Sequence, residues 1–117
     1  MKNLVSKQDY FNFSGEDLDN LFRVENSDNP SNAVNIFISR VQHQLLEELK
    51  ANYLVTDRML RNKQEILRQA IIYQIEYFLL VGSIYIDNPE QKSLLSQSAI
   101  NILRIGGIIK DKLVESD

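Results

Sequence analysis

The sequence predicts an all-α protein, a small helical bundle in which two long antiparallel helices are flanked by shorter ones. Between residues 70 and 81 the only polar side chains are Gln74 and Glu76, and a helix that is apolar nearly all round must be covered by other elements. Between residues 34 and 49, apolar side chains recur with the helical period and leave an opposite polar face. Because every strong periodic signal in the chain is helical, this amphipathic segment is expected to pack against the apolar one.

Length and composition fit one globular domain. The chain has 117 residues, of which 44% are hydrophobic and 25% are charged, values that are ordinary for a folded domain. We expect residues 1–107 to form this domain and residues 108–117 to form a C-terminal tail. The formal net charge of −3 argues against a generic nucleic-acid-binding protein, which carries a basic surplus.

The composition also limits the compartment and the chemistry. The absence of cysteine excludes disulfides and zinc–thiolate sites and fits a reducing compartment. The first residues lack the apolar core of a signal peptide. The central apolar run of about 12 residues is shorter than the roughly 20 that span a bilayer. A soluble intracellular protein is therefore expected, with no membrane partner.

Local start and stop signals define the first elements. Ser6, followed three residues later by Asp9, predicts the N-cap of a short helix over residues 7–11. Ser14 and Gly15 end it. Residues 16–22 predict a further turn or two, and residues 23–29 form a polar loop rich in turn-forming residues.

The two long helices follow from similar signals. Asn29 and Pro30 predict the start of the first, because proline is favoured at the first helical position, and its apolar period continues to about residue 52. Residues 53–61 are expected to be a connector. Asn62 has the capping-box spacing to a glutamate and predicts the start of a helix over residues 63–81.

A last amphipathic helix is predicted over residues 94–105. Ser93 or Ser96 would be its N-cap, and the glycine pair at 106 and 107 ends it. Its inward face would be formed by apolar residues at helical spacing, namely Leu95, Ala99, Ile102 and Leu103.

No residue pattern indicates an enzyme, and we predict no catalytic residue, no cofactor and no metal. His43 is the one histidine and faces Glu47 across one turn of the polar helix face, where a solvated pair is more plausible than a metal half-site. Glu76 lies among apolar neighbours, and a buried carboxylate can be catalytic. An open, solvent-facing stripe that also carries Gln74 is the favoured interpretation. An enzyme that uses Glu76 or His43 remains a competing hypothesis.

Charged residues are unevenly distributed along the chain. Acidic residues gather early, among them Glu16, Asp17 and Asp19, and basic ones gather later, at Arg58, Arg61, Lys63 and Arg68. Opposite charge on two parts of a molecule suits head-to-tail contact between copies, although a solvated surface explains it as well. The basic set could also contact phosphates or form an ion-pair cluster with Glu65.

Three segments together resemble a known family. A short N-terminal helix and an acidic loop precede a long amphipathic helix. Next comes a helix that has glutamine and alanine at positions 69 and 70 and then Gln74, Glu76 and Tyr77. The last helix has Leu95-Ser96, then Ala99, Leu103 and Gly106. This order resembles the head–tail connector proteins (adaptor or head-completion proteins) of long-tailed bacteriophages over nearly the whole chain. Gln97 is a departure, since the family often has proline there.

The resemblance implies a structural virion protein rather than an enzyme. About twelve copies would form a homo-oligomeric ring in the neck of the virion, between head and tail, after assembly in the host cytoplasm. The ring would bind the portal protein, extend the DNA channel without sequence-specific DNA binding, and join the head to the head-closure or tail-completion protein. The alternative is a small α-helical phage regulatory or protein-interaction module.

The resemblance also suggests which residues would make these contacts. The C-terminal segment would reach the portal, with four apolar anchors, Ile108, Ile109, Leu113 and Val114. A ring with one repeated contact requires two different faces that meet. The charged residues expected in this subunit interface are Glu16, Asp17, Asp19, Arg58, Arg61 and Arg68.

Overall fold

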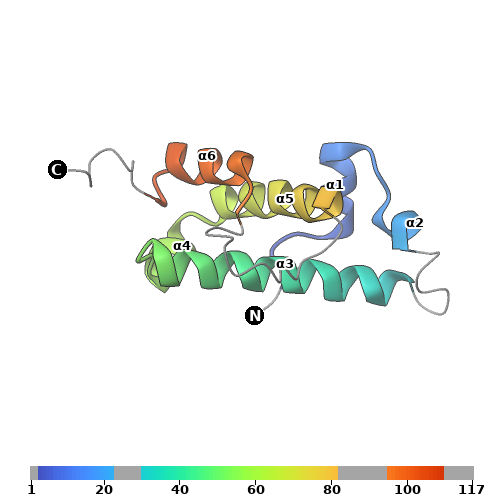
Figure 1. Cartoon of the computed structure of the whole chain (residues 1–117), viewed down its shortest axis with the longest axis horizontal. Coiled ribbons are helices and arrows are strands. Elements are labelled where there is room, and N and C mark those ends of the chain that lie inside the picture. The colour runs from blue at the N-terminus through green and yellow to red at the C-terminus, as the bar shows by residue number, and fades with distance from the viewer. Residues whose placement is uncertain (1–2, 23–29, 82–94, 110–117) are drawn as a thin grey trace.

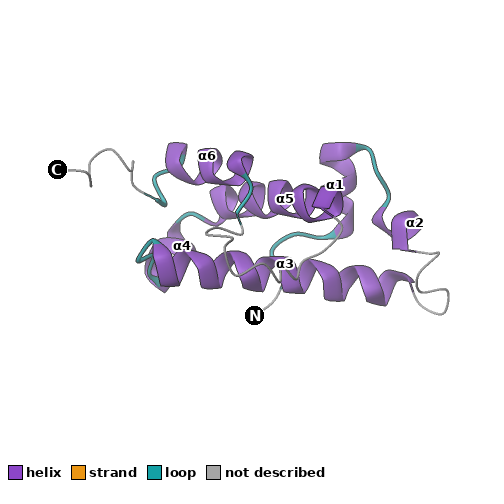
Figure 2. Cartoon of the chain, in the orientation of Figure 1, coloured by secondary structure: helices purple, strands orange, loops and turns teal. Residues whose placement is uncertain are grey.

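The computed structural model describes residues 3–22, 30–81 and 95–109, and every regular element within these residues is a helix (Figures 1 and 2). The two long helices, α3 (Pro30–Asn52) and α5 (Gln64–Val81), lie side by side and antiparallel. Helix α6 (Gln97–Ile105) lies along α5 on the side opposite α3. The predicted all-α bundle with two long antiparallel helices is confirmed.

The short helices lie at opposite ends of this bundle. Helices α1 (Lys7–Ser14) and α2 (Leu18–Phe22) are at the end where α3 begins and α5 finishes (Figure 1). Helix α4 (Asp57–Asn62) is at the other end, in the connection from α3 to α5. The bundle therefore has an α1–α2 end and an α4 end, and no described element other than the long helices and α6 lies between them.

The N-cap that the sequence predicts at Ser6 is confirmed, and with Asp9 it forms a capping box. The Ser6 hydroxyl accepts a hydrogen bond from the Asp9 backbone N–H at 3.1 Å, and the Asp9 carboxylate accepts one from the Ser6 N–H at 2.9 Å. Two donors that an isolated helix start leaves unpaired are thereby satisfied. The helix continues to Ser14, three residues beyond the expected end, because its stop is Gly15, whose φ of 79° lies in the left-handed region.

The connection between the long helices differs from the prediction. Residues 57–61 of the expected connector, together with Asn62, form α4, whose N-cap is Thr56; the Thr56 hydroxyl accepts a hydrogen bond from the Met59 N–H at 3.3 Å. Leu60 of this helix is buried in the core, and its burial favours a helix where the sequence alone shows only a short apolar pair. The prediction of a plain connector is therefore wrong.

The predicted N-cap at Asn62 is wrong as well. Asn62 is the last residue of α4, and Lys63 joins the two helices. The Lys63 N–H donates to the Leu60 carbonyl at 3.3 Å, and the Lys63 carbonyl accepts from the Leu67 N–H at 3.0 Å. Because α4 and α5 are joined through one residue, the chain has no room for a separate capping box at this point.

Helix α5 is the centre of the core. Its buried face packs among α3, α6, α1 and α4, and each fully buried Leu, Ile or Phe side chain contributes roughly 1.5–3 kcal/mol. The buried apolar residues of the three longest elements of the core are Val34, Ile38, Val41, Leu45, Leu46, Leu49, Leu67, Ala70, Ile71, Ile75, Phe78, Ala99 and Leu103.

The segment after α6 also belongs to the core. Gly107 has a φ of 82° and reverses the chain, and the N–H groups of Ile108 and Ile109 both donate to the Leu103 carbonyl, at 2.9 Å and 3.3 Å. The Ile108 and Ile109 side chains are 1% and 4% exposed. These two residues, expected at the start of a docking tail, therefore pack inside the folded domain. Leu113 and Val114 lie outside the described residues.

Gly106 allows α6 to approach α5 closely. A Cβ atom at this position would overlap the branched side chain of Ile66. The Gly106 N–H donates to the Ile102 carbonyl at 2.9 Å and closes α6. The glycine therefore serves a close helix–helix approach as well as a helix end.

We expect Gly106→Ala to lower the free energy of unfolding by about 1–3 kcal/mol, because the added methyl group overpacks a filled site. Ile66→Ala in the same chain should remove the obstruction, so the double variant should be more stable than the sum of the two single changes predicts. Urea denaturation of the four proteins measures this coupling. Strict additivity would contradict the close approach.

Candidate functional site

The two residues considered for catalysis lie on different helices, His43 on α3 and Glu76 on α5. His43 and Glu47 are both exposed on α3, with 3.6 Å between His43 Nε2 and Glu47 Oε1, an arrangement that contributes little even when the histidine is charged. In the part of the chain that the structure describes, no three His, Cys, Asp or Glu side chains lie close enough to share a metal ion. Glu76 is partly buried on α5.

The expectation that Gln74 lies on an open stripe is wrong. Its side chain is 1% exposed, and its Oε1 accepts a hydrogen bond from the Ser96 N–H at 3.0 Å. The Ser96 hydroxyl in turn accepts from the Ala99 N–H at 3.0 Å and so caps α6. Gln74 thus links the two helices through a buried hydrogen bond that positions the start of α6 on the middle of α5.

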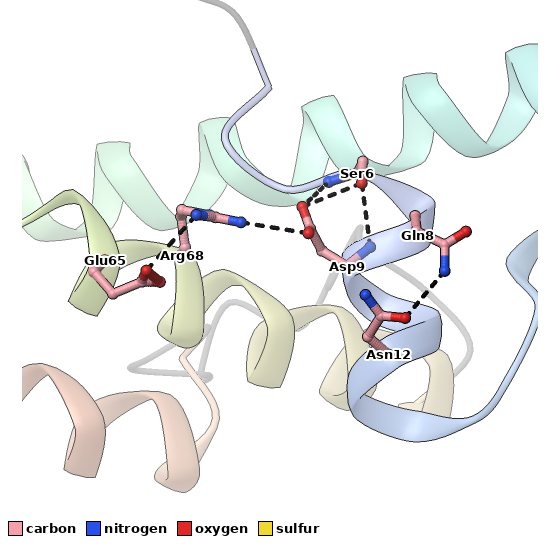
Figure 3. Close-up of polar contacts among 6 residues, drawn as sticks. All are labelled: Ser6, Gln8, Asp9, Asn12, Glu65 and Arg68. Carbon is pink, nitrogen blue, oxygen red and sulfur yellow. Dashed lines mark hydrogen bonds and ion pairs between the residues drawn. The ribbon is translucent and has the colours of Figure 1, made fainter.

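Two of the six charged residues expected in a subunit interface are paired within the chain. Lys7 Nζ lies 2.6 Å from Asp19 Oδ2, which ties α1 to α2. Arg68 lies between two carboxylates, with Nη2 3.3 Å from Asp9 Oδ1 and Nη1 3.7 Å from Glu65 Oε1 (Figure 3). Asp19 and Arg68 therefore hold the subunit together, and Arg68 links α5 to α1.

The other four are exposed and lie at opposite ends of the bundle. Glu16 and Asp17 are in the turn between α1 and α2, and Arg58 and Arg61 are on α4 (Figure 1). Within the described residues, none of the four takes part in an ion pair, whereas Asp57 at the start of α4 is paired with Lys50 at 2.9 Å. The α4 end consequently presents basic side chains, and the α1–α2 end presents acidic ones.

Exposed apolar residues accompany these charges, and the sequence analysis missed them. Leu54, between α3 and α4, is 83% exposed, and Ile105, the last residue of α6, is 84% exposed. The α3–α4 connection and the end of α6 both lie at the α4 end (Figure 1). Leu80, in the last turn of α5 at the α1–α2 end, is 82% exposed. For Leu54, the sequence does contain a signal, the apolar triplet Tyr53-Leu54-Val55 in a short connector. Because a tight turn cannot bury three successive side chains, at least one of them is expected to be exposed.

The two ends are the candidate functional site. Within the described residues, each end has exposed charges that take part in no ion pair, together with an apolar side chain in solvent, and a contact with another protein could pair the former and bury the latter. Comparison with protein-family models, with curated proteins and with solved structures finds no match to this chain. Among the described helices, none combines the length and the apolar character that crossing a membrane requires.

The capping box of α1 predicts a defined pH dependence. The hydrogen bond from the Ser6 backbone N–H is the main cause that lowers the pKa of Asp9, and the positive charge of Arg68 adds to it. Because the pKa is lower in the folded than in the unfolded state, the carboxylate stabilises the fold above the unfolded value of about 3.9. This contribution is lost as the pH falls through the lowered folded pKa.

We expect Asp9→Asn to reduce the free energy of unfolding at pH 7 by about 0.5–2 kcal/mol and to weaken its decline in acid. Urea denaturation at pH 7 and near pH 3 measures both effects. Glu47→Gln, on the exposed face of α3, is the matched control and should stay within about 0.5 kcal/mol of the unmodified protein at pH 7. An unchanged acid dependence in Asp9→Asn would argue against the capping box as its source.

Proposed function

We propose that this protein is a non-enzymatic structural subunit, a head–tail connector of a long-tailed bacteriophage. About twelve copies form a ring beneath the portal, extend the DNA channel, and join the head to the head-closure or tail-completion protein. The proposal combines the resemblance of the helix order with one observation: exposed, unpaired charges of opposite sign lie at the two ends of the bundle.

The opposed ends support ring formation. A ring built from one repeated contact needs two different faces on each subunit. The α4 end, with Arg58 and Arg61, and the α1–α2 end, with Glu16 and Asp17, are such a pair. The ion pairs of Asp19 and Arg68 inside the subunit remove these two residues from the contact that we propose.

Other features of the chain agree with this role. The portal anchors in the proposal are Leu113 and Val114, because Ile108 and Ile109 are buried. The net charge of −3 suits a channel through which DNA must pass, since a strongly basic lining would bind its phosphates.

We expect the purified protein, mixed with capsids that carry a portal but no tail, to add ring-shaped density at the portal vertex in negative-stain electron micrographs. Arg58→Glu with Arg61→Glu should remove this density, because like charges would then meet across the contact. Circular dichroism serves to establish that the variant is folded.

A charge-swapped chain is the control for this experiment. Adding Glu16→Lys and Asp17→Lys to the double arginine variant restores the net charge of the unmodified chain and again places opposite charges at the two ends. This chain should recover ring density. Capsids that stay bare with the unmodified protein would refute the connector function and favour a regulatory or interaction module. Rings that persist in the double arginine variant would refute the charge-based contact.

A further inference from the structure

The connector between α3 and α4 holds a leucine in a conformation that favours glycine. Leu54 has a φ of 55°, and among the described residues it is the one non-glycine residue with a positive φ. The left-handed region is sterically unfavourable for residues with a Cβ atom, and helix ends usually place Gly or Asn there. The backbone at this turn is therefore strained by its own residue type.

The geometry of the turn explains why the left-handed conformation is needed. The N–H groups of Tyr53 and Val55 both donate to the Leu49 carbonyl, at 3.1 Å and 3.2 Å. This reversal buries the Val55 side chain in the core and starts the chain toward α4. The conformation at position 54 thus serves the fold, and a smaller residue would adopt it with less strain.

The side chain of Leu54 does nothing to offset this strain within the subunit. It is 83% exposed, so it forgoes the burial that makes leucine favourable in a folded chain. Backbone strain clusters at functional sites, and an apolar side chain as exposed as that of Leu54 becomes favourable only when another surface covers it.

Charge complementarity favours a second copy of this chain as the surface that covers Leu54. Four residues after Leu54, Arg58 begins the exposed basic pair of α4, and the one acid of this helix, Asp57, is paired with Lys50. The opposite end of the same molecule has the complementary composition. It combines the exposed carboxylates of the α1–α2 turn with the exposed side chains of Leu80 and Phe11.

We propose that Leu54 is the apolar anchor of a head-to-tail contact between copies of this chain. The α4 end of one subunit docks on the α1–α2 end of the next, where Leu54 is buried against the apolar side chains and the two arginines face Glu16 and Asp17. Each added subunit leaves one end of either kind free, so the contact extends into a ring or a filament. The inference rests on the same two ends as the proposed function, but it requires no capsid and no portal.

Cysteine cross-linking tests this contact cleanly, because the chain has no cysteine of its own. Three proteins are compared with a short bismaleimide at high concentration: Asn20→Cys on α2, Asn62→Cys on α4, and the chain with both changes, which leave the four charges of the contact in place. We expect no cross-linked product from either single variant alone, dimers when the two are mixed, and a ladder of oligomers from the double variant.

Two further changes in the double-cysteine chain test the role of Leu54. Asparagine adopts the left-handed conformation readily but lacks the apolar side chain. In Leu54→Asn, the amount of cross-linked oligomer should therefore fall by about tenfold or more, as expected when a central apolar anchor is removed. Leu54→Met keeps an apolar side chain of similar size and should retain the ladder. Circular dichroism and denaturation establish that both variants are folded.

Several results would overturn the inference. Dimers from Asn62→Cys alone would show a symmetric contact between two α4 ends, and the absence of any ladder would show that copies do not meet in this way. A ladder that is unchanged by Leu54→Asn would remove Leu54 from the contact. The two proposals can fail separately. If the double-cysteine chain gives a ladder but capsids stay bare, only the connector function is refuted. If density appears on capsids but no ladder forms, only this contact is refuted.

Discussion

The apolar surface of α5 is the constraint on which the structure depends. A helix of this composition cannot face water, and α3, α6, α1 and α4 all contact it. One polar side chain within this surface, Gln74, is buried, and its hydrogen bond to the Ser96 N–H fixes where α6 begins. Because an unpaired buried amide would cost about 1–3 kcal/mol, this bond gives α6 a defined position on α5.

Whether a structural feature can be predicted from the sequence depends on how far apart in the chain its interacting residues lie. The capping box at Ser6 and Asp9 and the cap at Ser96 depend on residues three apart, so local spacing is sufficient. The role of Gln74 depends on Ser96, 22 residues away, and one helix pattern cannot distinguish an open stripe from an internally paired one. The same limit applies to Arg68, whose partner Asp9 belongs to α1, and to Ile108 and Ile109, whose burial follows from the reversal at Gly107.

The candidate site was predictable to a similar degree. Charge placement along the chain indicates two opposite ends, and four of the six charged residues selected from it are exposed there. Leu54 was missed because its importance comes from its positive φ and its exposed side chain. Neither of these can be predicted from the spacing of apolar residues. Some charges tie helices together, as in the Asp9–Arg68–Glu65 cluster (Figure 3), whereas Glu16, Asp17, Arg58 and Arg61 take part in no ion pair among the described residues. The interior therefore specifies the fold, and the ends are where we place the function.

The central claim is that Leu54 serves a contact between subunits at some cost to the subunit itself. The most direct measurement is the free energy of unfolding of Leu54→Asn, determined by urea denaturation at a concentration at which the protein is monomeric. We expect a value equal to that of the unmodified protein or higher by up to about 1 kcal/mol, because strain is relieved and no burial is lost. A decrease of about 2 kcal/mol or more, the size expected for a buried leucine, would show that Leu54 stabilises its own subunit and is not reserved for a contact between subunits.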